Sequence, residues 1–269
     1  MSRDSTMEKD LSVPFRKADR PGGTKTLFKL TWVEMKLFVR EPLTMVFTFA
    51  LPVIFLFVMG GVFGNTPDPS VYRGVGPMDY YVPAYFGLVL AAIGVVALPV
   101  HLTSYRERGI LRRFHASSFS IWSVLGSQLL VSFVIAILGS ILLLIVAMAT
   151  YQPHLPEQTG LLIPAFILST LCFTSFGFFL GAVIPTTRSA QGLGLILFFV
   201  MLILGGAGPP PEVLTGAMRV VGDIFPLRYV ITLLQDPWLG FGWAGTASLI
   251  VAGYTIAAVI LSSRFFKWE

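Results

Sequence analysis

Charged side chains are scarce in this sequence. Only 12% of its 269 residues are Asp, Glu, Lys or Arg, and 55% are hydrophobic, whereas a soluble domain averages about 25% charged residues. So little charge excludes an ordinary soluble globular protein and predicts a membrane protein. Cysteine is also nearly absent. Because Cys172 is the single cysteine, no disulfide can form within the chain, and cysteine content does not indicate an oxidising or a reducing compartment.

Several motifs of enzymes and ion-driven transporters are missing. The patterns GxxxxGK[ST], HExxH and GxSxG do not occur, so the chain lacks these signatures of P-loop ATPases, zinc proteases and serine hydrolases. No charged residue lies in the middle of a predicted span, although ion-coupled transporters usually need such groups. His101 and His154 lie at span ends and His115 in a basic loop. We predict interfacial or loop roles for all three, no catalysis, and no metal or cofactor bound by this chain.

Six long stretches contain no Asp, Glu, Lys or Arg. A hydrocarbon core needs roughly 20 helical residues to cross it, so these stretches predict an all-α polytopic protein. The expected spans are 43–63, 81–103, 121–150, 161–184, 190–208 and 241–263. Residues 1–23 are polar and lack the apolar core of a signal peptide, which predicts a disordered cytoplasmic tail. The transmembrane domain is expected to occupy residues 24–269.

The basic residues predict how the six spans are oriented. With the N-terminus in the cytoplasm, 16 of the 19 Lys and Arg fall on the cytoplasmic side, and only Arg73, Arg219 and Arg228 fall outside. Cytoplasmic loops of membrane proteins carry such an excess of Lys and Arg. Both termini are therefore predicted to be cytoplasmic. A basic patch at a membrane face also argues against binding of nucleic acid.

The fourth predicted span leaves two questions open. Gly177 and Gly181 form a GxxxG pair, which serves either close packing inside the bundle, the favoured interpretation, or a homodimer contact. The span is also rich in phenylalanine and includes Phe173, Phe176, Phe178 and Phe179. These rings and Tyr254 either line a cargo path or, as we favour, pack toward lipid.

The segment 24–41, TKTLFKLTWVEMKLFVRE, is typical of an amphipathic helix. Its basic residues share one side at 100° per residue: Lys25, Lys29, Lys36 and Arg40. Such a helix lies in the headgroup plane, with lysines toward anionic lipid, and Pro42 ends it. Glu34 and Glu41 lie seven residues apart on the otherwise apolar side. They either reach the interface at the helix margin or meet basic residues of another element.

The loop between the second and third spans, SYRERGILRRFHASSFS, contains four arginines in eight residues. A simple positive-inside role would account for the charge alone. However, Glu107 lies among the arginines, Gly109 follows, and Ile110, Leu111 and Phe114 recur at helical spacing. This pattern predicts a short cytoplasmic helix that docks in a groove of a soluble partner.

The last long segment outside the spans runs from 205 to 240. It begins GGAGPPPE, and Pro226 separates two amphipathic pieces. Leu227, Val230, Ile231 and Leu234 share one face of the second piece. Because so much apolar surface is unfavourable in water, we predict two short helices that dip into the outer leaflet or cap the bundle.

These three segments, in this order around six spans, resemble the membrane subunit of type-2 ATP-binding-cassette (ABC) exporters, and most of all the bacterial daunorubicin-resistance type of drug-exporter permease. LFKLTWVEMKLFVREPLTMVF is similar to the family's connecting helix and first span. YRERGILRRFHASSFS is similar to its coupling helix, in which ER-G-[TI]-L-[KR]-R recurs. GPPPEVL and IFPLRYVITLLQDPWLG are similar to its extracellular re-entrant hairpin.

The resemblance implies three sets of functional residues. Those that couple to an ATPase are Tyr105, Arg106, Glu107, Arg108, Gly109, Arg112 and Arg113. Those of the interfacial connecting helix are Lys29, Trp32, Glu34, Lys36, Arg40 and Glu41. Those of the extracellular hairpin are Pro210, Glu212, Pro226, Arg228 and Tyr229.

The resemblance also implies partners, location and cargo. Two permeases, identical or paralogous, would lie in a bacterial plasma membrane. They would work with two separate ATPase subunits that hold ATP and Mg. We expect export of small drug-like, antibiotic or lipid-like amphipathic molecules. Export of polysaccharide or lipid-linked glycan is the alternative cargo, and a non-transporting membrane scaffold or a membrane-embedded enzyme are alternative classes.

Overall fold

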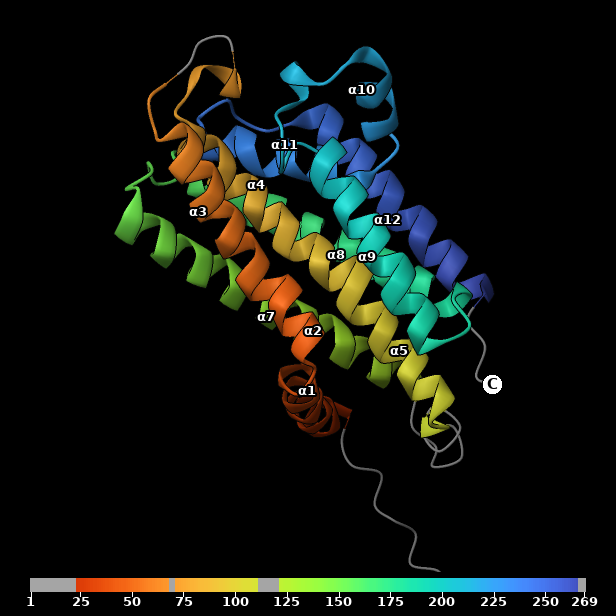
Figure 1. Ribbon diagram of the computed structural model, residues 1–269. Helices are drawn as coiled ribbons and strands as arrows, with labels where there is room; N and C mark the ends of the chain where they lie inside the picture. The colour runs from red at the N-terminus through yellow and green to blue at the C-terminus, as the bar shows by residue number, and fades with distance from the viewer. Residues whose placement is uncertain (1–22, 68–70, 111–120, 266–269) are drawn as a thin grey trace, which may run out of the picture.

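The computed structural model describes residues 23–67, 71–110 and 121–265. This part of the chain is helical, without a strand, and six of its helices are long and apolar enough to cross a membrane. The prediction of an all-α polytopic protein is confirmed. The six spanning helices form one bundle (Figure 1). In chain order they are α2–η1–α3 (Pro42–Met45, Val46–Ala50, Leu51–Phe63), α4–η3–α5 (Pro77–Ala91, Ala92–Ala97, Leu98–Glu107), α7 (Ile121–Thr150), α8 (Thr159–Val183), α9 (Thr187–Leu204) and α12 (Gly245–Phe265).

Shorter elements lie at the two ends of the bundle. Helix α1 (Gly23–Val39) lies at one end, and α10 (Gly216–Gly222) at the other (Figure 1). The α10 end also holds η2 (Tyr72–Gly74), η4 (Pro211–Val213) and α11 (Pro226–Trp238). The two ends are called the α1 end and the α10 end below.

The second span, α4–η3–α5, is the centre of the bundle. In its most apolar stretch 94% of residues are buried within the chain, against 22–44% in the other five spans. It packs against α3, α7, α8, α9 and α11. Burial rather than apolarity distinguishes it, since its mean hydropathy of 2.1 lies within the 1.7–3.1 range of the other spans.

Glycines let the neighbouring helices approach the second span closely. A Cβ added at Gly177 would lie 2.5 Å from the carbonyl oxygen of Gly94, and one at Gly194 would lie 2.3 Å from that of Val95. At Gly181 an added Cβ would meet the Leu102 side chain at 2.7 Å. The GxxxG pair therefore packs against the second span within the chain, as the favoured interpretation predicted.

Wide π-helical turns interrupt the first two spans. Each of the turns η1 and η3 precedes a helix with proline in its first two positions, Pro52 and Pro99 respectively. A proline ring clashes with the carbonyl four residues earlier in a regular helix. A wide turn relieves that clash, and such turns are frequent at functional sites.

Several span boundaries differ from those expected from charge alone. The second span extends to Pro77 and Glu107, because the charged groups at its ends, Asp79 and Glu107, have hydrogen-bond partners. The fifth ends at Leu204 rather than 208, since Gly206 adopts a positive φ of 95°. The sixth begins at Gly245 rather than 241, after two glycines that also have positive φ. Left-handed glycines end helices in this way.

The two predicted helices after Pro210 have different environments. Helix α11 packs against α4, α8 and α12, and the predicted apolar face is fully buried, with Leu227, Val230, Ile231 and Leu234 at most 2% exposed. At 13 residues it is about 20 Å long, too short to cross a bilayer. Helix α10 instead exposes Met218, Val220 and Val221.

Candidate coupling site

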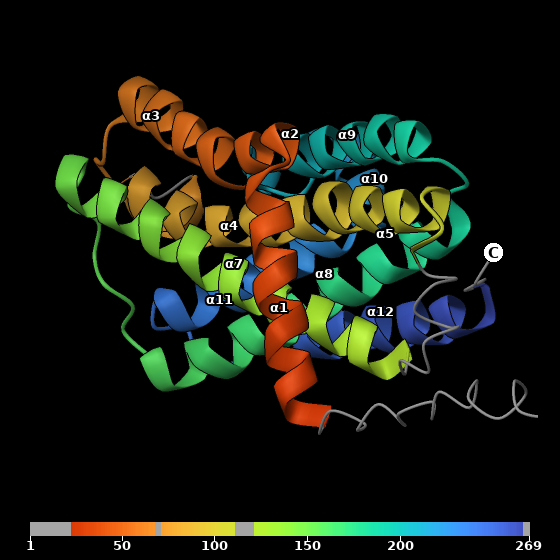
Figure 2. The ribbon, with the colours of Figure 1, turned by 90° about the horizontal axis from the view of Figure 1, so that it is seen from below.

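Helix α1 runs crosswise beneath the bundle and packs on α7 (Figures 1 and 2). It ends before Pro42, and Glu41 is extended there, as expected of a residue before proline. Its buried face carries Glu34 and Phe38. Among residues 28–40, whose side chains the structure describes, the exposed ones are Phe28, Lys29, Trp32, Val33, Lys36, Val39 and Arg40. This mixture of basic and large apolar side chains is typical of a helix at a lipid headgroup surface.

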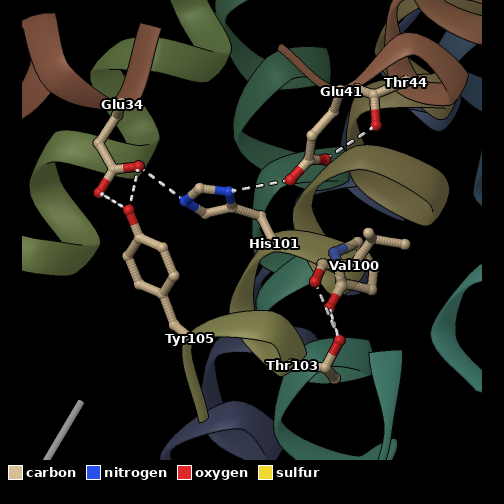
Figure 3. Close-up of polar contacts among 8 residues, drawn as sticks. Glu34, Glu41, Thr44, Val100, His101, Thr103 and Tyr105 are labelled. Carbon is tan, nitrogen blue, oxygen red and sulfur yellow. Dashed lines mark hydrogen bonds and ion pairs between the residues drawn. The ribbon is translucent and has the colours of Figure 1, made fainter. Parts of the chain in front are cut away.

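Glu34 is the centre of a buried polar cluster (Figure 3). Its carboxylate lies 2.6 Å from Nε2 of His101 and accepts hydrogen bonds from the Tyr105 hydroxyl at 2.8 Å. Nδ1 of His101 lies 3.8 Å from Oε1 of Glu41, and the other carboxylate oxygen, Oε2, accepts a 3.3 Å hydrogen bond from the Thr44 hydroxyl. We call Glu34, Glu41, His101 and Tyr105 the Glu34 cluster. Of the two alternatives for Glu34, the one in which it meets a basic residue of another element is correct.

His101 is the member of this cluster that the sequence did not assign to the site. It was expected to have an interfacial role, but its side chain is buried between two carboxylates. The available signal was its spacing from Tyr105, because residues four apart share one face of a helix. The Glu34 cluster joins α1 to α5, because separation of the two helices would leave Glu34 and His101 without each other as hydrogen-bond partners.

On the side of α5 away from α1, residues at the end of α5 contact the turn between α8 and α9. The Arg106 guanidinium donates to the carbonyls of Gly181, at 3.3 Å, and of Ile184. The Glu107 carboxylate accepts from the Thr187 amide at 2.9 Å and from its hydroxyl at 2.8 Å. A cation therefore lies at the C-terminus of α8 and an anion at the N-terminus of α9, which complements both helix dipoles. We call these the corner contacts.

The remaining residues of the predicted coupling set follow α5. Arg108 is exposed. Gly109 has a φ of 64° and donates its amide to the Arg106 carbonyl at 3.0 Å, which is a common way to end a helix. Arg112 and Arg113 lie outside the described residues. The structure thus brings Glu34, Glu41 and Tyr105 together and places Arg106 and Glu107 on the neighbouring corner.

A comparison with protein families matches residues 25–237 to the ABC-2 type transporter model. The chain belongs to the ABC-2 type transporter family. A comparison with curated proteins found no match. As an ABC-2 protein, the chain is a membrane permease of an ABC transporter, a transport component that is generally not catalytic. Among its described residues no group of three or more His, Cys, Asp or Glu is placed to hold a metal ion.

The hairpin residues of the permease lie at the α10 end, far from the Glu34 cluster (Figure 1). Pro226 is buried at the start of α11. Arg228 forms an ion pair with Asp223 at 3.0 Å, and the Tyr229 hydroxyl donates to the Asp223 carbonyl at 3.0 Å. These contacts connect α11 to the chain just after α10. The segment before α10 contains Pro210, which is buried, and Glu212, which is exposed.

A pair formed by His154 and Asp79 at the α10 end predicts that stability depends on pH. The Asp79 carboxylate accepts from the His154 amide at 2.7 Å and lies 3.0 Å from its Nδ1. That hydrogen bond and the negative charge of Asp79 raise the pKa of His154 above its usual value. A raised folded-state pKa stabilises the fold while the imidazole is protonated, and this contribution is lost as pH rises through that pKa.

We therefore expect His154→Gln to lower the thermal midpoint of the purified permease at low pH and to have little effect at high pH. Because the imidazole is 87% exposed, solvent screening keeps the difference small. Thermal unfolding of both proteins in detergent across a pH series measures it. An equal difference at every pH contradicts a role for the charged imidazole.

Proposed function

We propose that the chain is the transmembrane subunit of an ATP-driven exporter of drug-like, antibiotic or lipid-like amphipathic molecules. In this proposal two permease copies, or this chain and a paralogue, work with two ATPase subunits that bind ATP and Mg. The α1 end would face the cytoplasm of a bacterial cell, a side supported by the 16 of 19 basic residues assigned to it.

One observation carries the coupling part of this proposal: the end of α5 is bonded on both sides. The Glu34 cluster joins it to α1, and the corner contacts join it to α8 and α9. An ATPase that binds the segment following Gly109 would therefore act on four helical elements together. A partner that binds one arrangement of these elements more tightly than another shifts the population between them.

Arg106 and Glu107 have a narrower role in this proposal than the family resemblance implies. Both side chains are engaged by α8 and α9 of the same chain, so they would transmit movement rather than contact the ATPase. The exposed Arg108, together with Arg112 and Arg113, would then form the basic contact with the partner. The exposed face of α1 would rest on lipid headgroups beside it.

The interior of the bundle supports an amphipathic cargo. Its buried side chains are mainly apolar, and several buried hydroxyls, including those of Thr48, Ser140, Ser169 and Thr174, have no hydrogen-bond partner among the described residues. Such hydroxyls suit occasional polar groups on a largely apolar molecule. A glycan would instead require many hydrogen-bonding partners along its path, and we find no feature in the described spans that favours it.

Replacement of Glu107 by alanine tests the coupling role. We expect transport into inverted vesicles to fall several-fold, with normal expression and membrane insertion, because α9 loses its carboxylate contact with α5. Glu107→Gln, which keeps an acceptor for Thr187, should retain more activity than alanine. Glu157→Ala, at an exposed site near the α10 end, is the matched control. Unaltered transport in Glu107→Ala would contradict the coupling role.

The direction and the partner require separate measurements. We expect a candidate ATPase to co-purify with the chain, and amphipathic compounds to stimulate its ATP turnover. Uphill movement by the purified permease alone would refute the proposal. A reporter fused to the C-terminus should read as cytoplasmic, and an external signal there would reverse the proposed orientation.

A further inference from the structure

A small cavity adjoins the Glu34 cluster between α1, the second span and α7. It has a volume of about 20 Å³, and its polar lining consists of Glu34, Glu41, His101, Gln128 and Ser132. A cavity of roughly 10–15 Å³, measured in this way, is enough for one water molecule if polar partners surround it. The cavity is therefore large enough for a single water and too small for a cargo molecule.

Gln128 supplies an independent reason for a ligand in this cavity. Its side chain, on α7, is only 4% exposed, and its amide nitrogen has no hydrogen-bond partner among the described residues. Burial of an unpaired donor is unfavourable, and native structures usually satisfy it with protein or ordered water. An amide nitrogen needs an acceptor, which a water molecule provides while donating its own hydrogens to a carboxylate.

The imidazole of His101 has carboxylates at both ring nitrogens. Nε2 lies 2.6 Å from Glu34 and Nδ1 lies 3.8 Å from Glu41. A neutral imidazole has one N–H and can donate to only one of them, whereas the imidazolium has two. The protonated ring therefore fits this arrangement, and its charge offsets the buried negative charge of the two carboxylates.

Other groups around the ring do not replace that proton. On its own helix, Tyr105 donates to Glu34, and Arg106 is directed to α8. Arg108 and, on α1, Arg40 are exposed. From α7 the cavity receives the neutral Gln128 and Ser132, and from η3 only apolar side chains. Within the described residues, His101 is thus the cation between Glu34 and Glu41.

We propose that this cavity is a proton-binding site completed by one ordered water molecule. The proton resides on His101 and is shared in hydrogen bonds with Glu34 and Glu41. The water accepts from the Gln128 amide and donates to the Glu41 carboxylate, and so connects α7 to the cluster. Helix α1 is docked most tightly on the second and third spans while the site is protonated, and loss of the proton loosens it.

Protonation of this site would change the strength of the contact between α1 and α5, and so how far α1 moves together with α5. If the proposed function holds, acidification of the cytoplasm strengthens the connection between the ATPase side and the spans, and alkalinisation weakens it. This consequence rests on the proposed function. The site itself does not, because its proton and water belong to the permease alone and can be measured without ATPase or cargo.

The position of α1 can be measured by spin labels on the full-length permease in lipid nanodiscs. Val33→Cys on α1 and Val183→Cys at the end of α8 are half-exposed sites for labelling, whereas Cys172 is buried. From about pH 6 to about pH 10.5, a range extended above ordinary histidine titration because two carboxylates hold the proton, we expect the distance distribution between the labels to broaden. In the His101→Gln variant the distance distribution should be broad at both pH values, so its response to pH should be lost.

Two sets of variants make the outcome decisive. His154→Gln and His115→Gln should keep the pH response, and a response that disappears in either of them but persists in His101→Gln overturns the site. For the water, Gln128→Leu and Glu41→Gln should each increase the undocked fraction. The double variant should exceed the larger single effect only slightly, because both act through one molecule. Additive effects overturn the water bridge, and a pH-independent distribution in the unmodified permease overturns the proton site.

Discussion

Replacement of Glu34 by alanine is expected to produce the largest loss of stability among single polar substitutions in the described chain. The side chain is 3% exposed and accepts from both His101 and Tyr105. Removal of one partner from a buried ion pair typically costs 3–5 kcal/mol, because the remaining group is left uncompensated. Since His101 can release its proton when its partner is lost, we expect about 3 kcal/mol, near the lower limit of that range.

The loss can be measured as a shift in the thermal midpoint of the purified permease. Glu34→Gln should be milder than Glu34→Ala, because its amide oxygen still accepts from Tyr105. Lys36→Ala is the matched control, since Lys36 lies two residues away on the same helix and is exposed. Exposed substitutions usually change stability by less than about 0.5 kcal/mol. If Glu34→Ala and Lys36→Ala melt alike, the Glu34 cluster does not hold α1.

The permease carrying Gly194→Ala is expected to fold poorly or not at all. An added Cβ at this position would lie 2.3 Å from the carbonyl oxygen of Val95 in the second span. Backbone atoms cannot rotate aside, so α9 would have to move away from the central helix. Overpacking of a core typically costs about 1–3 kcal/mol, and we expect the upper part of that range because the clash is with backbone.

Gly192→Ala offers a close control for this substitution. Gly192 lies in the same helix, one turn or less away, and an added Cβ there would have no neighbour within 4 Å. Alanine is favoured over glycine in a helix by up to about 1 kcal/mol, so Gly192→Ala should be neutral or slightly stabilising. Detergent-solubilised yield and thermal midpoint measure both variants. Equal behaviour of the two would contradict the close packing of α9 on the second span.

The sequence was sufficient to predict the architecture, because in a membrane both length and charge are constrained. A run of about 20 residues without charge has few alternatives to a spanning helix, and the described chain has six. The boundaries were less predictable. Charges at Asp79 and Arg106 ended the predicted second span early, although both side chains have partners far away in sequence, His154 for Asp79 and the Gly181 and Ile184 carbonyls for Arg106.

The candidate site was only partly predictable for the same reason. Glu34 and Glu41 attracted attention as acidic residues on an apolar face, but the partner of Glu34 is 67 positions away in sequence. No periodicity within one helix identifies such a contact. Similarly, the resemblance marked Arg106 and Glu107 as coupling residues, whereas their bonds to Gly181 and Thr187 depend on how α8 and α9 meet α5.

The burial of the second span has a consequence for how the bilayer affects this permease. Changes in bilayer thickness act on helices that contact lipid, through tilt and hydrophobic mismatch. In the second span almost every residue contacts protein instead. Membrane composition can therefore influence this helix only through its neighbours, chiefly the first and fifth spans, whose apolar stretches are 28% and 33% buried. Thicker or thinner membranes should alter those outer helices first.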